Sequence, residues 1–179
     1  MVPASASCLL DGAQLDASLL RLAREIVAEI GSDETLALLG IRTRGLPIAE
    51  RLVRHLNTLL GREVLLGSLD ITLYRDDLAE RSGVPIVRPT EIPFALQGRT
   101  VLLVDDVVFS GRTIRAALDA MLDHGRPRCV KLVALVDRGG RELPIQPDFT
   151  GMKLEVPANQ RVTVKLHEID GEDGVFLGA

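Results

Sequence analysis

Apolar residues recur along the chain with the three-to-four spacing of a helix in three places. Between residues 15 and 30 they step by four, three, four and four, which predicts one buried face of a helix. The same spacing recurs in 48–59, behind Pro47 at an expected first turn, and in 114–122. The glycine that follows each run predicts where the helix ends: Gly31, Gly61 and Gly125.

Short apolar runs lie between and after these helices and predict strands. The central runs are apolar at successive positions, which is typical of strands covered on both faces of a parallel sheet. Strands that alternate with helices predict an α/β fold with a mostly parallel central sheet flanked by helices. The predicted strands are 36–41, 64–73, 101–104, 129–136, 162–166 and 175–177, the last two as closing strands.

Three loops are expected at one edge of this sheet: 42–45, 105–112 and 137–151. Right-handed crossovers bring the carboxyl ends of parallel strands to the same edge, where open α/β sheets bind their ligands. Residues 74–91 are charged and contain Gly83 and two prolines, which predicts a further long excursion from the sheet.

The composition predicts an ordinary soluble protein with one domain over residues 1–179. No apolar stretch approaches the ~18 residues of a membrane span, so we expect a cytoplasmic protein without a membrane partner. The formal net charge of −4 and the absence of Trp give no global signal for nucleic-acid binding, although a local basic face stays open. Cys8 is expected to be a free thiol near the terminus, and Cys129 a small buried hydrophobe.

The segment Val101–Thr113, VLLVDDVVFSGRT, carries the strongest chemical signal. Its apolar strand delivers two adjacent carboxylates, Asp105 and Asp106, to the open edge of the sheet. From Val107 the chain is expected to turn into a helix whose free backbone N–H groups bind a phosphate. Acids beside such a cradle suit a phosphorylated sugar, because carboxylates accept hydrogen bonds from vicinal hydroxyls. Hydroxyl donors and a close backbone approach would come from Ser110, Gly111 and Thr113.

A solvated acidic turn with an Asp, Ser or Thr cap is the alternative interpretation of an acid pair after a strand. The complete order of apolar run, acid pair, Ser-Gly-x-Thr and helix disfavours that alternative. The chain contains neither a GxxxxGK[ST] loop nor a dinucleotide-binding GxGxxG pattern, so these two kinds of nucleotide site are excluded.

Three further segments are expected near the acid pair. The loop Arg42–Gly45 offers exposed amides and fixed cations that suit pyrophosphate, although alone it is also typical of an ordinary polar loop. Leu69–Leu78 (LDITLYRDDL) leaves a strand with a Tyr-Arg-Asp-Asp run and is either a lid over a reaction centre or a charged surface loop. Leu135–Gly151 spans the loop after the following strand.

The acid-pair segment closely resembles the phosphoribosyl pyrophosphate (PRPP) signature of type I phosphoribosyltransferases. Together the four segments resemble the pyrimidine operon regulator (PyrR) subfamily, uracil phosphoribosyltransferases that also bind RNA. The resemblance runs from about Leu9 to Gly174, and its subfamily-specific parts are Asp70–Leu78 and Val136–Ile145. It implies the type I phosphoribosyltransferase fold with a small hood loop at about residues 70–92. It also implies the conversion of uracil and PRPP to UMP and pyrophosphate with Mg²⁺.

The resemblance further implies roles for individual residues. Asp105 and Asp106 would bind the ribose hydroxyls of PRPP, and Arg44 would act with them as a catalytic residue at the departing pyrophosphate. The hood loop would contribute Arg75 and Asp76. No residue is predicted to bind a metal directly, because Mg²⁺ would arrive with PRPP. The other implied contacts are Thr43, Arg44 and Gly45 for pyrophosphate, Val108, Phe109, Ser110, Gly111, Arg112 and Thr113 for the 5′-phosphate, and Val136, Asp137 and Arg138 for uracil, largely through backbone groups.

Several departures from the subfamily pattern concern RNA binding. Phe109-Ser110 replaces a usual Tyr-Thr pair, and Gly140 stands where His is common. Gln146 and Met152 stand where basic residues are usual. Candidate phosphate contacts for a pyrimidine-operon mRNA leader are Arg21, Arg24 and Arg141, with a solvated helix face as the alternative for the first two.

Two functions remain open on this resemblance. One is an active enzyme, and the other is a non-catalytic regulator that senses PRPP or UMP while it binds RNA. The retained pyrophosphate loop and hood acids favour the enzyme, with regulation as a second role. The resemblance also implies a homodimer or a larger homo-oligomer.

Overall fold

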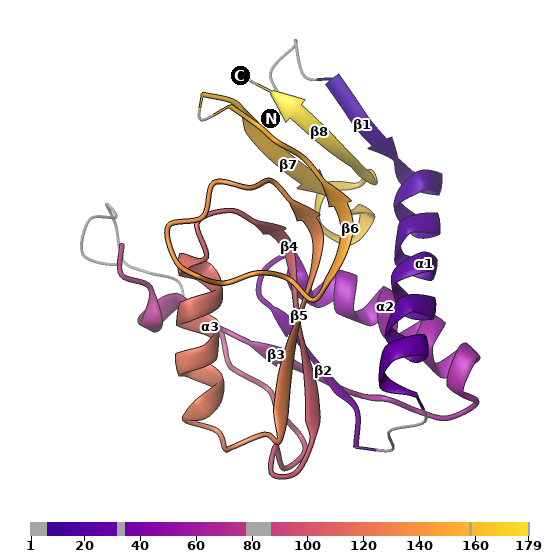
Figure 1. The fold of residues 1–179 in the computed structure, drawn as a ribbon, viewed down its shortest axis with the longest axis vertical. Coiled ribbons are helices and arrows are strands. Elements are labelled where there is room, and N and C mark those ends of the chain that lie inside the picture. The colour runs from indigo at the N-terminus through magenta and orange to yellow at the C-terminus, as the bar shows by residue number, and fades with distance from the viewer. Residues whose placement is uncertain (1–6, 32–34, 78–86, 158, 179) are drawn as a thin grey trace.

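The computed structural model describes residues 7–31, 35–77, 87–157 and 159–178, which form two β-sheets with helices around them (Figure 1). The larger sheet is parallel, with the strand order β3-β2-β4-β5-β6, and the smaller is antiparallel, with the order β1-β8-β7. The strands are β1 (Ser7–Asp11), β2 (Ala37–Ile41), β3 (Leu65–Leu69), β4 (Thr100–Val108), β5 (Cys129–Asp137), β6 (Phe149–Lys153), β7 (Arg161–Lys165) and β8 (Gly174–Gly178). The helices are α1 (Gly12–Ile30), α2 (Gly45–Leu60), the 3-10 helix η1 (Thr72–Tyr74), α3 (Arg112–Leu122) and α4 (His167–Asp170).

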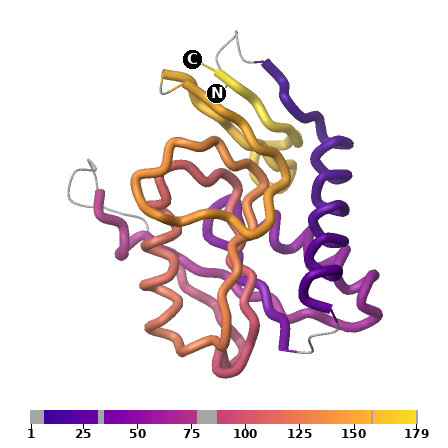
Figure 2. Tube along the Cα trace, viewed as in Figure 1, coloured from indigo at the N-terminus to yellow at the C-terminus, as the bar shows by residue number. Residues whose placement is uncertain are grey.

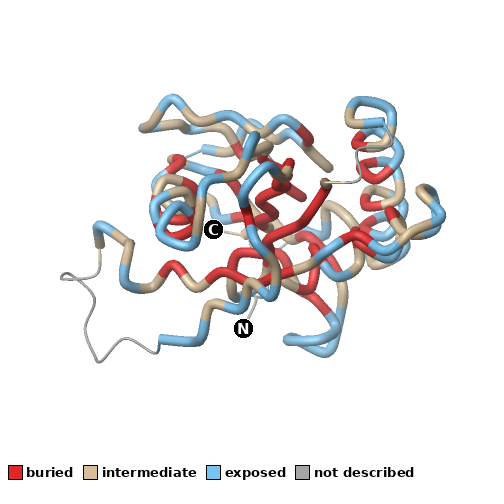
Figure 3. The backbone as a smooth tube through the Cα atoms, turned by 90° about the horizontal axis from the view of Figure 1, so that it is seen from below, coloured by how far each residue is buried: buried red, intermediate tan, exposed pale blue. Residues whose placement is uncertain are grey.

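Helices cover both faces of the larger sheet, because successive side chains of its central strands point to opposite faces. In β2, Leu38 packs in one apolar cluster with α1 and α2, whereas Leu39 packs in a second cluster with α3. In β4, Leu102 lies in the first cluster and Leu103 in the second. The buried residues therefore run through the middle of the molecule (Figure 3). Because the central strands are covered on both faces, their sequences are apolar at successive positions.

The smaller sheet brings the two ends of the chain together (Figure 2). β1 pairs with β8, placing Ser7 opposite Leu177, and β8 pairs with β7. Val162, Val164 and Val175 of this sheet join the apolar cluster of α1 and α2. The strands predicted at 162–166 and 175–177 are confirmed. They belong to a sheet of their own with β1, a strand that the apolar pattern did not reveal.

Two predicted strand ends are wrong. β3 ends at Leu69 and not at residue 73, because the Asp70 carboxylate accepts hydrogen bonds from the Thr72 N–H (2.8 Å) and hydroxyl (2.5 Å) and the chain turns into η1. β4 continues through Val108, past the turn expected at Val107. Its ladder with β5 extends to Val108, which lies opposite Asp137, so the acid pair belongs to a strand.

β6 lies inside a segment that was predicted as a loop. It pairs in parallel with β5, with Phe149 opposite Val133, and forms one edge of the larger sheet. Phe149 is its one buried side chain. An edge strand with a single buried residue lacks the apolar run from which the other strands were predicted.

Three residues expected in the core are exposed. Leu59 and Leu122 lie in the last turns of α2 and α3 and are 40% and 54% exposed. Cys129 begins β5 and is exposed, as is Cys8; both thiols are free. Residues 78–86 of the predicted hood loop lie outside the described residues. Within the described part of the chain, no helix has the length and apolar character that a membrane span requires.

Leu102 and Leu122 provide a matched test of this core. Leu102→Ala should lower the free energy of unfolding by about 2–5 kcal/mol, because it leaves a cavity between the sheet and the helices. Leu122→Ala removes the same atoms from a half-exposed site and should change it by less than about 0.5 kcal/mol. Urea denaturation measures both values, and equal losses would contradict the described packing.

Candidate active site

Two adjoining cavities open at the carboxyl edge of the larger sheet. The first, of about 340 Å³, is lined by the loop 42–44, by Asp105 and Asp106, and by the base of the hood loop at Ile71, Thr72 and Arg75. The second, of about 290 Å³, is lined by residues 107–114 and by 75–77. Both cavities are lined by Arg75, Val107 and Thr113, which makes them neighbours. Segments far apart in the sequence therefore meet around the acid pair.

The acid pair lies near the end of β4, with Asp105 buried and Asp106 half-buried. Asp105 is 5% exposed, and its Oδ1 accepts the Asp106 N–H at 3.0 Å. Asp106 Oδ1 accepts the Val107 N–H at 2.8 Å. Burial raises the pKa of Asp105 well above its usual range, and the charge of Asp106 raises it further. Burial also raises the pKa of Asp106, although the Val107 N–H and the positive charge of Arg44 oppose this. Such a pair favours a ligand that brings hydroxyl donors or positive charge.

Gly45 lets the start of α2 approach this strand. A Cβ at Gly45 would lie 2.3 Å from the carbonyl oxygen of Val104 and 3.2 Å from Cα of Asp105. A side chain at this position would therefore push α2 and the loop before it away from the acid pair. The glycine that was predicted to contact pyrophosphate thus has a packing role at the site.

The two arginines of the loop 42–44 bind different parts of the protein. The Arg42 guanidinium donates to the Ser68 hydroxyl on β3, and the peptide bond between Arg42 and Thr43 is cis. Thr43 and Arg44 line the first cavity. Arg44 Nη2 donates to Asp170 Oδ1 at 2.9 Å, and its Nε is buried without a hydrogen-bond partner among the described residues. One end of Arg44 is therefore anchored, and one buried donor is left over for a ligand.

The loop from Phe109 to Gly111 leads from β4 into α3. Gly111 has φ 92°, a backbone conformation that favours glycine, and α3 begins at the next residue. The first N–H groups of α3 have no acceptor within the helix and lie at the positive end of its dipole, which favours an anion. Ser110 is fastened from the other side, because its carbonyl accepts the N–H groups of Glu142 and Leu143 at 2.9 and 3.0 Å. Val108 lies in β4 with its side chain buried.

The described part of the hood loop rests on α3. Asp76 pairs with Arg112 at 2.7 Å, and Arg112 also pairs with Glu142 at 2.6 Å. The Tyr74 carbonyl accepts a hydrogen bond from Arg115 at 2.8 Å. Arg75 pairs with Asp77 at 2.7 Å. Arg112 thereby connects the hood loop to the loop after β5 beside the second cavity.

The segment predicted to border uracil, Val136–Arg138, makes side-chain contacts within the protein that its sequence did not predict. Val136 is buried in the core, and the Asp137 carboxylate accepts hydrogen bonds from Gly139 N–H (3.0 Å) and Arg141 (2.7 Å). The Arg138 guanidinium lies 4.1 Å from the centre of the Phe109 ring, and its Nε and Nη2 are buried without a partner among the described residues. The Arg138 side chain therefore stacks on Phe109, and it is not among the residues that line the two cavities.

Gly140 explains why Phe109 can take this position. A Cβ on Gly140 would lie 2.4 Å from Cε2 of the Phe109 ring, and the φ of Gly140 is 72°. The stacking of Phe109 on Arg138 therefore depends on a glycine at position 140. Two departures from the subfamily pattern, at Phe109 and Gly140, are coupled by direct contact.

The candidate RNA contacts do not share one environment. Arg21 on α1 donates to the Gly151 carbonyl (2.5 Å) and pairs with Glu25 (2.5 Å). Arg24 on the same helix is exposed. The Arg141 side chain is 12% exposed and donates to Asp137 Oδ1 and to the carbonyl oxygens of Phe109 and Ile145. Arg141 thus organises the loop after β5, whereas Arg24 is accessible.

Sequence patterns did not point to Asp170 as a neighbour of the site, and they placed Ile71 and Thr72 both in a predicted strand and in the segment Leu69–Leu78 expected near the acid pair. Ile71 and Thr72 lay inside a predicted strand, and the turn at Asp70 brings them to the cavity. Asp170 reaches Arg44 from 126 residues away in the chain. Their contribution depends on tertiary contacts, for which a single sequence has no local signal.

The buried Asp105 carboxyl should make the free protein less stable as the pH rises. The folded state binds a proton at Asp105 more tightly than the unfolded chain does. Stability is therefore lost as the pH rises from the usual carboxyl range through the raised pKa. Asp105→Asn should remove that loss and add about 1–3 kcal/mol to the free energy of unfolding above this range. The measurement is urea denaturation between pH 4 and 8, with exposed Glu63→Gln as the control. A destabilised Asp105→Asn variant would contradict the described burial.

Comparisons with known proteins agree with this geometry. The model of the phosphoribosyl transferase domain matches residues 5–167. The chain is 52% identical to the "Bifunctional protein PyrR" of Thermus aquaticus over 169 residues, which cover 94% of this chain and 93% of that protein. It is 48% identical to the protein of the same name from Pelotomaculum thermopropionicum, again over 94% of this chain and 93% of the relative.

Solved structures of similar shape are much more distant in sequence. The hypoxanthine phosphoribosyltransferase of Trypanosoma cruzi superposes with a TM-score of 0.71 at 16% identity, covering 96% of this chain and 95% of that one. A hypoxanthine-guanine phosphoribosyltransferase from Bacillus anthracis gives a TM-score of 0.69 at 18% identity, covering 96% of each chain. At these identities the likeness concerns the fold. The family model and the close relatives together show that this chain belongs to the PyrR subfamily of the phosphoribosyltransferases.

Proposed function

We propose that the protein transfers the phosphoribosyl group of PRPP to uracil, forming UMP and pyrophosphate. The observation that carries the proposal is the Asp105–Asp106 pair, buried at Asp105 and half-buried at Asp106, between a cationic loop and a helix amino terminus. The names of the close relatives agree with a regulator that is also an enzyme. PRPP carries a 5′-phosphate, a ribose with two vicinal hydroxyls and a pyrophosphate, and each part has a matching feature here.

Each part of PRPP can be assigned to one wall of the site. The 5′-phosphate would accept hydrogen bonds from the loop 109–111 and the first turn of α3, where N–H groups converge. The ribose hydroxyls would donate to Asp105 and Asp106. The pyrophosphate would lie against Thr43 and Arg44. The anomeric carbon would then lie between the acid pair and the pyrophosphate loop.

The reaction would develop positive charge on the ribose as the bond to pyrophosphate lengthens. The carboxylates of Asp105 and Asp106 would stabilise that charge, and Arg44 would stabilise the departing pyrophosphate. The nitrogen of uracil then forms the new bond to the anomeric carbon, and its proton is released. Arg75 and Asp76 belong to the hood loop, which would exclude water that otherwise hydrolyses PRPP.

The residues of the site fit a substrate that carries Mg²⁺. When bound with PRPP, the ion would neutralise part of the pyrophosphate charge, and Asp105 and Asp106 would be the acids that face it. The raised pKa of both acids agrees with a site that lacks sufficient positive charge of its own. We propose that the ion arrives on PRPP, bound to its pyrophosphate, because the subfamily resemblance implies Mg²⁺ as part of the substrate.

Regulation of a pyrimidine operon is the second proposed role, because the close relatives are named as bifunctional. UMP in the active site would control binding of the mRNA leader. Arg21 and Arg24 are the proposed phosphate contacts, and Arg141 would act through the loop that it organises. A catalytically weak sensor is the less favoured alternative, since the pyrophosphate loop and the acid pair are both present. A homo-oligomer and a cytoplasmic location are also proposed from the subfamily.

The base is tested by supplying PRPP and Mg²⁺ with uracil, orotate, hypoxanthine or adenine in parallel. Uracil should be converted to its nucleotide, and the other three should show little or no turnover. Asp106→Asn should lower kcat/KM for the uracil reaction by a factor of roughly 10²–10³. This factor corresponds to a loss of about 3–4 kcal/mol of transition-state stabilisation. Turnover of a purine without turnover of uracil would refute the base, and an unaltered kcat/KM would refute the role of Asp106.

RNA binding is tested by restoring two positive charges. Gln146→Arg/Met152→Lys should bind a structured pyrimidine-operon leader RNA more tightly than the unmodified chain. Each new phosphate contact should steepen the log–log salt dependence by about 0.7–0.9. A Gln97→Arg variant, on another exposed loop, controls for added charge in general. Identical affinity and slope in the double variant and the unmodified chain would show that positions 146 and 152 do not face RNA.

A further inference from the structure

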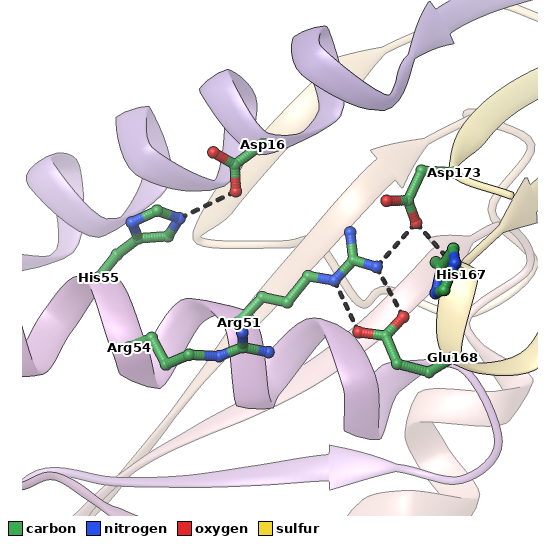
Figure 4. A pocket seen from close by; sticks show the side chains of 7 residues that line it. All are labelled: Asp16, Arg51, Arg54, His55, His167, Glu168 and Asp173. Carbon is green, nitrogen blue, oxygen red and sulfur yellow. Dashed lines mark hydrogen bonds and ion pairs between the residues drawn. The ribbon is translucent and has the colours of Figure 1, made fainter.

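The turn between β7 and β8, residues 166–173, is fixed against α2 by Arg51 (Figure 4). Arg51 donates from Nε and Nη2 to the two carboxylate oxygens of Glu168 at 2.9 and 2.6 Å. Its Nη2 also donates to Asp173 Oδ1 at 2.7 Å, and that oxygen accepts the His167 N–H at 2.8 Å. The Arg51 side chain is 12% exposed. Because paired donors and acceptors of this kind fix geometry, the turn is a rigid platform beside the start of α2.

Asp170 projects from this platform to the pyrophosphate loop. Its Oδ2 accepts the N–H of Leu166, a fully buried residue, at 3.0 Å. Its Oδ1 accepts Arg44 Nη2 at 2.9 Å. The Asp170 side chain is 20% exposed, and that of Arg44 is 33% exposed. The carboxylate is thus held by the backbone on one side and holds the guanidinium on the other.

The other side of Arg44 faces the acid pair. Arg44 lines the first cavity with Asp105 and Asp106, and its charge lowers the pKa of Asp106 against the effect of burial. Its buried Nε has no partner among the described residues. A free arginine at a helix start can adopt many rotamers, so anchoring one nitrogen reduces the conformational entropy lost when an anion binds.

We propose that Asp170 is a positioning residue for Arg44, and through it for the pyrophosphate end of the substrate. The inference rests on the proposed function. Asp170 touches neither substrate nor reacting atoms; it holds the Arg44 guanidinium over the cavity so that the remaining N–H groups meet the pyrophosphate oxygens. The turn between the last two strands thereby becomes part of the catalytic apparatus, although it lies outside the PRPP signature.

The test compares Asp170→Asn, Asp170→Glu and Glu172→Gln in steady-state kinetics. Glu172 lies on the same turn and pairs with Lys165, so its substitution removes an equal charge away from Arg44. Asp170→Asn should raise the KM for PRPP, and that for pyrophosphate in the reverse reaction, roughly 10-fold, because a hydrogen bond between charged groups is weakened. The KM for uracil should stay the same. Asp170→Glu should recover part of the loss, and Glu172→Gln should behave as the unmodified protein.

A double-mutant cycle separates positioning from a general structural role. In an Arg44→Ala background, Asp170→Asn should have no further effect on the KM for pyrophosphate, because the positioned group is gone. Equal effects of Asp170→Asn in both backgrounds, or parallel losses of all constants with a lower unfolding temperature, would overturn the positioning role. A lower KM for PRPP in Asp170→Asn would also overturn it. If the unmodified protein neither binds nor turns over PRPP, the proposed function fails and the inference fails with it.

Discussion

Two adjacent carboxylates at the end of β4, one buried and one half-buried, are the constraint on which the rest of the site depends. Water would stabilise their charges, but Asp105 is almost fully buried and Asp106 lies next to it. Burial and mutual repulsion raise the pKa of Asp105 well above its usual range. A protein retains such an arrangement at a cost in stability, which is typical of a site built for a ligand that supplies the missing donors or charge.

The surrounding structure brings partial compensation from two directions. Arg44 approaches from the start of α2, and Arg75 from the base of the hood loop, and their charges lower the pKa of Asp106 and Asp105 respectively. Gly45 allows the first approach, because any side chain there would collide with β4. On the far side, Gly111 turns the chain so that the amino end of α3 faces the second cavity. Under the proposed function, this order of cations, acids and helix amides would match the pyrophosphate, ribose and phosphate of PRPP.

Much of this could be predicted from the sequence, because its signals are local. Apolar runs and, for β3, partial alternation revealed four of the five strands of the larger sheet, and Val101–Thr113 carried the acid pair and the loop before α3 in one stretch. β6 was not predicted, because an edge strand with one buried residue has no apolar run in its sequence. The stacking of Phe109 on Arg138, the commitment of Arg141 to its own loop and the Asp170–Arg44 pair all depend on side chains that meet only in the folded chain. Departures such as Gly140 were visible in the sequence, but their reason became clear from the contact with Phe109.

The central claim is that the acid pair, completed by the loops around it, binds PRPP. Calorimetric titration of PRPP with Mg²⁺ into the unmodified protein tests this most directly, with the Asp105→Asn/Asp106→Asn double variant as the comparison. The geometry predicts saturable binding at one site per chain, weakened by at least roughly 10-fold in the double variant, because two charged acceptors for the ribose hydroxyls are lost. An absence of binding to the unmodified protein, or equal affinity in both proteins, would contradict the claim.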